Sequence, residues 1–521
     1  PGEYFLDRNT GKLYVYPPED INSAEICIST NRNSFMSFKN ARYITVENLN
    51  FEGSCGNAIS MEYCKYVDVK FCRILNIAGT AVTIIGGSDS NIYGCEIYNI
   101  GGSGVVSYAG DRQTLAPGNI VVENCHIHKF AQYSKTYTPA VKLDFVGNTI
   151  INNVIHDCPH TAIMFGNNDN KILYNEIYDV CQETDDCGAI YGGRTWTSYG
   201  NVISNNYIHD VRGPGSQSIA VYCDDMMSGI TMENNVLDSV TQAFGIGGGH
   251  YNTVNNNLIM NKTKYSKAAM YYDDRGLVAW FGDPYRKDPE NHELTKNLKA
   301  VPYQSELWRE KYPMLEKSLE GDPLEPKGGV VTNNIVSNHK PFEIADKVIE
   351  NGTVENNYVT DSEIYINRDA RGKYSFNDAN GVFEEFPDFK VPDIENVGLL
   401  EDWPFDYPEQ FVYEEKTVEY VKKDAPDIDV TPILENVDKW DSSNAKVTKN
   451  GDVIDISEGA TGYLGEKFEN GKMKFKFAMN DKSSWVGFML HSSVTNKAPW
   501  VDGKSYLIIV KKDSFELQRW Y

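Results

Sequence analysis

A short stretch, residues 183–201, combines acidic, basic and aromatic side chains around a run with strand character. It reads ETDDCGAIYGGRTWTSYGN and places Asp186 before an apolar triplet, with an arginine and a tryptophan after it. A second stretch, AVYCDD, ends on the neighbouring pair Asp224 and Asp225. Crowded carboxyl groups differ in pKa, so one can hold a proton while another stays ionised. Such groups can act as general acid and as base or nucleophile, and these three are the candidate catalytic residues.

The segments that would position these acids repeat along the chain. Short runs such as FCRI, NCHI, NNVI and NNYI each end on an apolar residue. Their ends follow at irregular intervals, for example 23 residues from Ile74 to Ile97 and 31 residues from Ile177 to Ile208. This irregularity indicates a coil of short strands joined by loops of variable length.

Two positions before each of these ends, the sequence carries a column of amide or thiol side chains. Stacked amides of successive coils are expected to hydrogen-bond to one another and to the turn backbone. Small thiols can fill the same positions, so we expect the cysteines of this column to be packing residues rather than partners in disulfides. The column is Cys72, Cys95, Cys125, Asn153, Asn175, Asn206, Asn235, Asn257, Asn334 and Asn357.

A second column of small residues, mostly alanine, opens strands with period-2 alternation, as in AVTII, AVKLD, AIYGG and AVYCD. Alternation assigns neighbouring residues to opposite faces of a strand. The residues one position after the small residue are expected to face the core: Val82, Val141, Ile163, Ile190, Val221 and Phe244. Those two or four positions after it are expected to face outward.

Together these columns predict an all-β chain whose first part is a right-handed parallel β-helix, a solenoid of stacked coils. We expect this domain over residues 1–377, with a helical or irregular insertion at about 281–327. Residues 378–424 are acidic and contain proline, which predicts a strap or linker. Residues 425–521 alternate as strands and predict part of a β-sandwich, a jelly-roll of lectin-like type.

The outward positions of at least five coils form one stripe of acids, cations and aromatic rings. Aromatic faces pack on the C–H surface of a sugar ring, while acids and arginine hold its hydroxyls. Cleavage of a glycosidic bond needs two carboxyl groups. The expected substrate-binding residues are Lys142, Asp144, His160, Tyr191, Arg194, Trp196, Tyr222, Tyr271 and Asp273.

The predicted register raises a difficulty for the pair Asp186 and Asp225. One precedes its strand and the other follows the next, so a straight strand would separate them by more than about 15 Å. Catalytic carboxyl pairs lie about 5 to 9.5 Å apart. Either residues 182–187 fold back over the strand face, or the pair is a different one, such as Asp144 with Asp224.

The other histidines carry a weaker signal than His160. His126, His128, His156 and His209 occur beside the asparagine column, and we expect them to be turn residues. All ten cysteines precede residue 224, and none has the CxxC spacing of a metal site.

The net charge of −24 argues against nucleic acid or an anionic membrane surface as partner. No apolar run is long enough to span a membrane. We therefore expect a secreted, cell-surface or periplasmic protein, with any signal peptide upstream of the sequence shown, no required cofactor and a carbohydrate partner.

Several motifs together resemble the β-helix glycosidases around glycoside hydrolase family 141. They are GEYFLDRNTGKLYVYPP, IHDCPHTAIMFGNND, YNEIYDVCQETDDCGAIYGGRTW, AVYCDDMMSGITMENN and AVPYQSELWREKYP, spread over most of residues 1–360. The resemblance implies a fucosidase or xylanase type of activity on plant or other complex polysaccharides. It carries the catalytic aspartates onto Asp186 and onto Asp224 or Asp225. Thr195 stands where relatives often have aspartate, and residues 425–521 resemble concanavalin-like or laminin-G-like lectin domains.

Two other functions are compatible with the same stripe. A calcium-dependent polysaccharide lyase would hold Ca²⁺ with Asp144, Asp224, Asp225 and Asp273 and abstract a proton with Lys142 or Arg194. A non-catalytic adhesin would use the stripe only to bind glycans. The fold alone does not distinguish these from a glycosidase.

Overall fold

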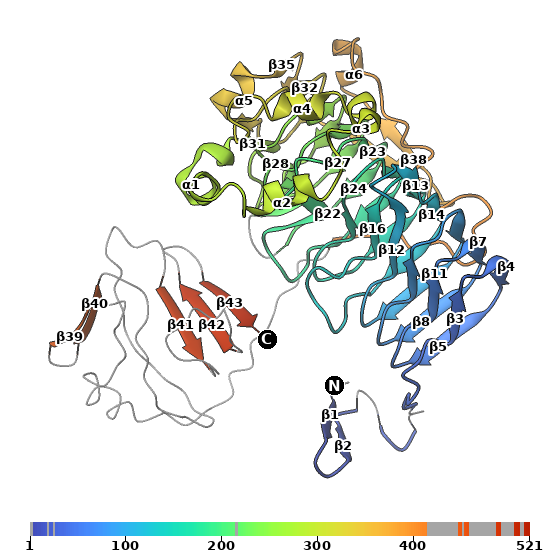
Figure 1. Cartoon of the computed structure of the whole chain (residues 1–521). Coiled ribbons are helices and arrows are strands. Elements are labelled where there is room, and N and C mark those ends of the chain that lie inside the picture. The colour runs from blue at the N-terminus through green and yellow to red at the C-terminus, as the bar shows by residue number, and fades with distance from the viewer. Residues whose placement is uncertain are drawn as a thin grey trace. The chain divides into compact units, whose positions relative to one another are not determined.

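The computed structural model describes residues 4–17, 20–23, 27–213 and 217–413, and the backbone of five strands further along the chain. The chain divides into two compact units, Pro1–Tyr413 and Glu414–Tyr521. The first unit is a right-handed parallel β-helix, as the sequence predicts (Figure 1). Each coil contributes one strand to each of three long parallel sheets, so strands far apart in sequence become neighbours.

The first sheet carries the predicted stripe. Its strands are, in spatial order, β3 (Met36–Lys39), β6 (Ile59–Glu62), β9 (Val82–Ile85), β12 (Val105–Asp111), β16 (Val141–Phe145), β19 (Ile163–Phe165), β22 (Cys187–Gly193), β25 (Ser218–Asp224), β28 (Gln242–Gly247), β31 (Met270–Asp273) and β34 (Glu343–Ile344), with β13 (Ala116–Pro117) paired to β12.

The second and third sheets complete each coil. The second contains β4 (Arg42–Glu47), β7 (Lys65–Lys70), β10 (Ser90–Tyr93), β14 (Ile120–Glu123), β17 (Thr149–Ile151), β20 (Lys171–Leu173), β23 (Asn201–Ser204), β26 (Ile230–Glu233), β29 (Thr253–Asn255), β32 (Val330–Thr332) and β35 (Thr353–Glu355). The third contains β5 (Asn50–Ser54), β8 (Arg73–Ile77), β11 (Glu96–Ile100), β15 (His126–His128), β18 (Val154–His156), β21 (Glu176–Tyr178), β24 (Tyr207–His209), β27 (Val236–Asp238), β30 (Leu258–Met260), β33 (Ile335–Ser337) and β36 (Tyr358–Thr360).

The predicted asparagine ladder is confirmed. The side-chain amide of Asn206, for example, donates to Asn235 Oδ1 at 3.0 Å and to the Ile172 carbonyl at 2.9 Å. Its own Oδ1 accepts from the backbone N–H and the side chain of Asn175, both at 3.0 Å. Each buried amide is thus satisfied by the coils on either side. The cysteines of the column are buried and free, so they are packing residues as expected.

The repeated Asn-Asn motif has a local cause. The first asparagine of each pair has a positive φ, as at Asn152 (54°), Asn205 (56°) and Asn256 (55°). Asparagine tolerates this left-handed conformation better than most residues do. The first asparagine therefore makes the corner between the second and third sheets, and the second points inward to the ladder.

The core lies inside the coil. All six residues predicted to face inward are fully buried, and so is the column of small residues from Ala58 to Ala269. Small side chains are needed there because the chain enters the first sheet at a tight corner.

A helical insertion follows β31. It contains η1 (Arg275–Leu277), α1 (Ala279–Lys287), α2 (Glu293–Lys299), α3 (Glu306–Lys311) and α4 (Met314–Ser318). Helices α2 and α3 begin where His292 Nδ1 and Ser305 Oγ accept from backbone N–H groups of the first turn. The apolar sides of these helices bury Leu294 and Trp308 against the solenoid.

After the last coils come α5 (Asp346–Glu350), the antiparallel pair β37 (Tyr365–Arg368) and β38 (Tyr374–Asn377), and α6 (Val382–Glu385). Residues 386–413, which we call the strap, then run back along the third sheet. Corner asparagines hold it: Asn256 bonds to the backbone of Lys390, and Asn152 donates to the carbonyls of Asn396 and Gly398.

The remaining described strands are the hairpin β1 (Tyr4–Asp7) and β2 (Lys12–Val15) near the N-terminus, and β39 (Lys446–Asn450), β40 (Val453–Ser457), β41 (Val486–Leu490), β42 (Ser505–Val510) and β43 (Phe515–Trp520) in the second unit. β39 and β40 pair antiparallel, as do β41, β42 and β43. The rest of the expected sandwich, and residues 414–424 of the expected linker, lie outside the described residues.

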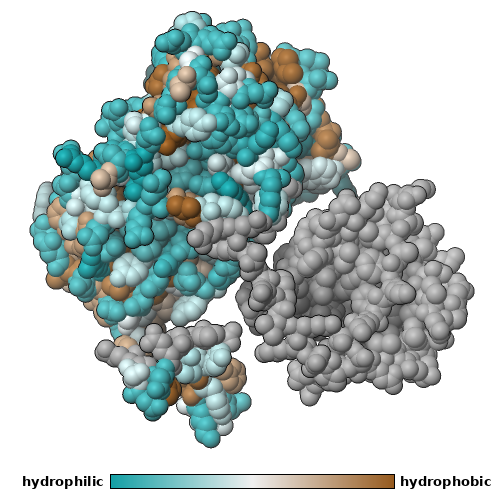
Figure 2. All heavy atoms as spheres, turned by 180° about the vertical axis from the view of Figure 1, so that it is seen from behind, coloured by the Kyte–Doolittle hydropathy of each residue, from teal (hydrophilic) through white to brown (hydrophobic). Residues whose placement is uncertain are grey.

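Where the structure describes the chain, it contains no helix with the length and apolar character that a membrane crossing requires. The solenoid surface in Figure 2 is largely hydrophilic, with apolar atoms in scattered patches.

Candidate functional site

The outward residues of the first sheet form two columns in register. In the first column, Lys142 pairs with Met164, Met164 with Tyr191, Tyr191 with Tyr222, and Gly245 follows before Tyr271. The second column contains Gly193 paired with Asp224, and Gly247 paired with Asp273. The predicted outward placement of these residues is therefore correct.

A carboxylate–arginine cluster lies at the far end of the second column. Arg275 Nη1 donates to Asp224 Oδ1 at 2.8 Å and to Asp225 Oδ1 at 2.9 Å. Its Nε and Nη2 bind both oxygens of Asp273, the Nη2 contact to Oδ2 being 2.9 Å. Bidentate and charge-assisted contacts of this kind fix the geometry of a carboxylate. The Arg275 side chain is only 11% exposed, so the cluster is largely shielded from water.

Glycines of β28 make room for this cluster. A Cβ atom on Gly247 would lie 2.5 Å from Arg275 Cζ, and one on Gly245 would lie 2.9 Å from the Tyr271 hydroxyl. Real Cβ atoms do not approach other atoms so closely. The missing side chains therefore let Tyr271 and Arg275 of the next coil lie over β28, and Arg275 reaches Asp224.

Asp186 reaches the same face because the chain bends just after it. A Cβ on Gly188 would lie 2.7 Å from Tyr222 Cβ and 2.8 Å from the Ile190 carbonyl oxygen, so only glycine permits the bend. Asp186 itself has a φ of 54°. Its Oδ1 accepts a hydrogen bond from the Tyr222 hydroxyl at 3.3 Å. The strand is thus not straight, and the separation expected from a straight strand does not apply.

Burial and the nearby negative charge of Asp224 both raise the pKa of Asp186, which favours its protonated form. Burial, followed by the charge of Asp224, also raises the pKa of Asp225. Asp225 nevertheless has cationic partners, because Arg194 Nε lies 3.2 Å from its Oδ2 and Arg275 contacts its Oδ1. Among the described residues, none forms a salt bridge with Asp186.

Tyrosines connect the two sides of the site. Tyr191 donates to Asp224 Oδ2 at 3.1 Å, and its ring contacts that of Tyr222 edge-on at 5.5 Å between centroids. Burial raises the pKa of both phenols, so both remain donors at neutral pH. Asp186 and Asp224 are therefore linked through one pair of contacting tyrosines.

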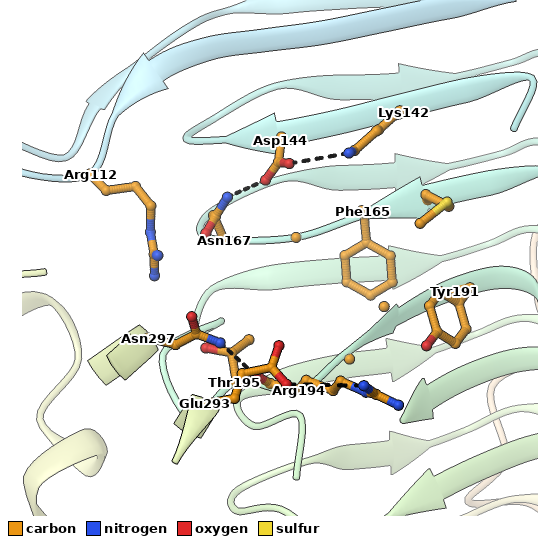
Figure 3. A pocket seen from close by; sticks show the side chains of 14 residues that line it. Arg112, Lys142, Asp144, Phe165, Asn167, Tyr191, Arg194, Thr195, Glu293 and Asn297 are labelled. Carbon is orange, nitrogen blue, oxygen red and sulfur yellow. Dashed lines mark hydrogen bonds and ion pairs between the residues drawn. The ribbon is translucent and has the colours of Figure 1, made fainter. Parts of the chain in front are cut away.

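A pocket of about 320 Å³ lies beside this cluster, over the first sheet (Figure 3). Asp144 lies on one side, where its carboxylate binds Asn167 and its Oδ2 lies 3.7 Å from Lys142 Nζ. On the other side Asn297 of α2 donates to the Arg194 carbonyl at 2.9 Å, so the insertion closes part of the rim. The lining residues are Arg112, Lys142, Asp144, Met164, Phe165, Gly166, Asn167, Tyr191, Gly192, Gly193, Arg194, Thr195, Glu293 and Asn297.

The pocket does not bring Asp144 and Asp224 together. Leu143 of β16 pairs with Phe165 of β19, Met164 of β19 pairs with Tyr191 of β22, and Gly193 of β22 pairs with Asp224 of β25. Two coils therefore lie between Asp144 and Asp224, and both carry glycine at the position of the acids. Three strand spacings amount to about 14 Å between their backbones. The register therefore does not bring this alternative pair into contact, and Asp144 lines the pocket whereas Asp224 belongs to the arginine cluster beside it.

Five predicted substrate contacts are not among the residues that line this pocket: His160, Trp196, Tyr222, Tyr271 and Asp273. Trp196 is 1% exposed and packs beneath the insertion with Tyr199, Met226 and Leu294, so its predicted outward position is wrong. His160 is 4% exposed; Tyr137 packs against its ring at 4.9 Å, and burial lowers its pKa to about 4. His160 therefore supports Tyr137 as a neutral imidazole.

The acidic residues do not fit a calcium site. The guanidinium of Arg275 lies between Asp224, Asp225 and Asp273, where a cation bound to all three would have to be. Asp144, the fourth acid of the expected set, lies at the opposite side of the pocket. In the described part of the chain, the one group of close side chains that could hold a metal consists of His126, His128 and His156, on the third sheet.

Arg275, Tyr137 and Glu293 are site residues that the sequence analysis missed. Arg275 had a signal: YYDDRG repeats the Asp-Asp pair of VYCDDM two coils later, at the same position along the strand, and adds a cation directly after it. Tyr137 comes from a loop, where its exposed ring contacts Tyr191 at 6.0 Å. Glu293 starts a helix of the insertion, and no repeat locates it in the sequence.

The comparison with protein-family models agrees with the fold. The family model described as "Right handed beta helix region" matches residues 19–153 and 140–259. A solved structure titled "Glycoside hydrolase" matches with 16% identity and a TM-score of 0.26, covering 42% of this chain and 38% of that one, so this chain corresponds to less than half of its length. No curated protein matches.

Proposed function

We propose that this chain is a glycoside hydrolase that cleaves a polysaccharide or oligosaccharide over the first sheet of the solenoid. The observation that carries the proposal is the pairing of two unlike carboxyl groups. Asp186 has a raised pKa, to which the charge of Asp224 contributes, and no salt bridge among the described residues, whereas Asp224 is held by Arg275 and Tyr191. Two carboxyl groups with different environments are what glycosidic cleavage requires.

In this proposal Asp186 is the proton donor. Its burial and the charge of Asp224 favour the protonated form, which a general acid needs before the leaving oxygen departs. The hydroxyl of Tyr222 keeps the carboxyl oriented toward the face of the sheet. Loss of this proton above the pKa of Asp186 would end catalysis.

Asp224 is the second carboxyl group, acting as nucleophile or as the base that activates water. Its Oδ1 accepts from Arg275 and from the backbone N–H of Asp225, and its Oδ2 accepts from Tyr191. These donors fix the carboxylate before substrate arrives, which is the preorganisation that catalysis needs. Asp225 keeps Arg275 and Arg194 in place, and is a positioning residue in this proposal.

The pocket lined by Asp144, Tyr191 and Arg194, beside the Asp224 cluster, is the proposed sugar-binding site. Its floor contains Gly166 and Gly193, so the backbone lies open, and Phe165 and Tyr191 offer aromatic surface. Acids, an amide and arginine surround this surface and can bind hydroxyl groups. Xylan-like or fucosylated glycans are the proposed substrate class, with secretion or surface display as the setting and a lectin-like second unit as an accessory binder.

The proposal is tested by mass analysis of products from a panel of plant polysaccharides and fucosylated glycans, with and without EDTA. We expect saturated products that gain one water per cleavage and are insensitive to EDTA. Asp186→Asn and Asp224→Asn should lose the activity, whereas Asp283→Asn should keep it, because Asp283 is an exposed residue of α1. Unsaturated products would instead identify a lyase and refute the proposal.

A further inference from the structure

Three histidines form a compact cluster on the outer face of the third sheet, which does not carry the proposed sugar site. His126 and His128 belong to β15, and His156 belongs to the neighbouring β18. One ring nitrogen from each lies within 4.8 Å of the other two. The Nε2 atoms of His126 and His156 are 2.8 Å apart. The sequence pattern predicts turn residues here; instead these histidines lie in strands, because the turn falls at the asparagine that precedes each strand.

Stacking accounts for the packing of these rings but not for the placement of their nitrogens. His128 and His156 are in register and belong to a run of stacked rings, from Tyr98 at 5.1 Å to Tyr178 at 4.6 Å. His126 belongs to the neighbouring column, where its register partner is Val154, and its ring stacks on that of His128 at 4.3 Å between centroids. The His126 ring also brings its Nε2 close to that of His156, so that three nitrogens lie near one another.

Two ring nitrogens in this cluster have no hydrogen-bond partner among the described residues. His126 is 6% exposed, and neither its Nδ1 nor that of His128 has a hydrogen-bond partner. Buried polar atoms normally have one. The cluster therefore offers ring nitrogens close to one another that a bound ion could engage.

We propose that His126, His128 and His156 together bind a divalent transition-metal ion, with Zn²⁺ as the best match. Imidazole nitrogen suits zinc, copper and nickel rather than calcium or magnesium. In a tetrahedral zinc site the Zn–N distances of about 2.0–2.1 Å place ligand nitrogens about 3.3 Å apart. The nitrogens here are 2.8 Å apart in the closest pair and within 4.8 Å in all pairs, so small ring rotations suffice.

The surroundings indicate what the ion does. The indole of Trp403, from the strap, contacts His126 edge-on at 6.3 Å between ring centroids. His128 and His156 remain partly exposed, so an ion can enter from solvent and a water molecule can complete its coordination. The ion would tie together two consecutive coils under the strap. It should therefore stabilise the folded chain, because ligands that bind only the folded state raise its stability.

The test uses the metal-free full chain with Cys27→Ser and Cys55→Ser, which removes the exposed thiols. Zn²⁺ binding is measured by calorimetry, and Co²⁺ binding by its visible absorption. His128→Phe keeps a flat ring in the stack but removes the nitrogen, and His156→Phe does the same one coil later. Tyr98→Phe, in the same stack, is the matched control.

We expect one Zn²⁺ per chain, a tetrahedral Co²⁺ spectrum and a higher melting temperature with metal. Each histidine variant should bind at least about 100-fold more weakly, exceeding the 10–100-fold that loss of an outer-shell partner produces. Tyr98→Phe should bind like the parent. The proposal is overturned if the parent protein shows no stoichiometric binding and no Co²⁺ absorption, or if both histidine variants bind as tightly as the parent.

Discussion

The asparagine ladder and the outward columns of the first sheet are built on the same coils but obey different rules. Inside, the same amide recurs from Asn153 to Asn357, and each copy makes the same bonds to its neighbours. Outside, the second column changes at nearly every coil, with Asp224, Gly247 and Asp273 in succession. The ladder is stabilised by repetition, whereas the candidate site depends on the breaks in the repeat.

The ladder positions therefore serve stability, whereas the positions where the outward column changes serve the candidate site. A change in the ladder should affect stability without touching the chemistry. A change at a break, such as a glycine under Arg275, should affect both, because the same contacts hold the fold and orient the carboxylates.

Arg275→Met should give the largest loss of stability. It leaves Asp224, Asp225 and Asp273 without their shared cation, and breaking a buried pair costs about 3–5 kcal/mol. Urea unfolding measures this loss. Arg194→Met is the control: its side chain is 57% exposed, so its loss should cost no more than about 1 kcal/mol. Equal losses in the two variants would contradict the central role of Arg275.

Gly247→Ala should place a side chain where the repeat is broken. We expect it to lower the free energy of unfolding somewhat less than Arg275→Met does. The new Cβ would meet Arg275 Cζ at 2.5 Å and displace the guanidinium, which should cost about 3 kcal/mol and most of the activity. Gly166→Ala, in the same column, would meet only Asp144 Oδ1 at 3.4 Å and should cost less than about 1 kcal/mol. Thermal unfolding of the two variants compares them directly.

Asn206→Ala should break the ladder without changing the site. It removes the acceptor for the Asn175 N–H and the donor to the Ile172 carbonyl, both buried, for a loss of about 2–3 kcal/mol. Catalytic constants should stay unchanged in the folded protein. Cys95→Ala, at the thiol end of the column, should cost less, since a thiol makes only weak hydrogen bonds. A large change in kcat for Asn206→Ala would show that ladder and site are coupled.

Stability should also depend on pH through His209, on the third sheet. Burial opposes its charge, but the carboxylates of Asp210 and Glu176 raise its pKa to about 9. Because this value exceeds the usual 6.5, the stabilisation is complete below pH 6.5 and is lost as pH rises through about 9. We expect the free energy of unfolding to fall by on the order of 3 kcal/mol over this range. His209→Gln should flatten the curve; an unchanged slope would refute the assignment.

The sequence predicted the solenoid well because its signals recur in every coil. Each Asn-Asn motif marks both a corner and a ladder position. If the predicted register were shifted by one residue, Ile190 and Val221 would both face solvent. Each coil therefore checks the others, and the inward residues are buried as expected.

The site was predicted less well because its parts occur once. Asp186 lies near Tyr222 because the chain bends at Gly188, where the backbone comes close to Tyr222. Trp196 follows a strand of the stripe but lies under the insertion, and no pattern in the sequence shows which residues a later segment covers. Arg275 could have been found by aligning its Asp-Asp pair with that of the earlier coil.

The most direct test of the account separates the roles of Asp186 and Asp224 by leaving group. Each Asp→Asn variant is assayed on the glycoside identified by product analysis and on the same sugar carrying a nitrophenolate leaving group, which needs no proton. If Asp186 is the general acid, Asp186→Asn should lose about 100-fold or more on the natural bond but little on the activated one. Asp224→Asn should lose activity on both. Equal losses for Asp186→Asn on the two substrates would contradict its role as proton donor.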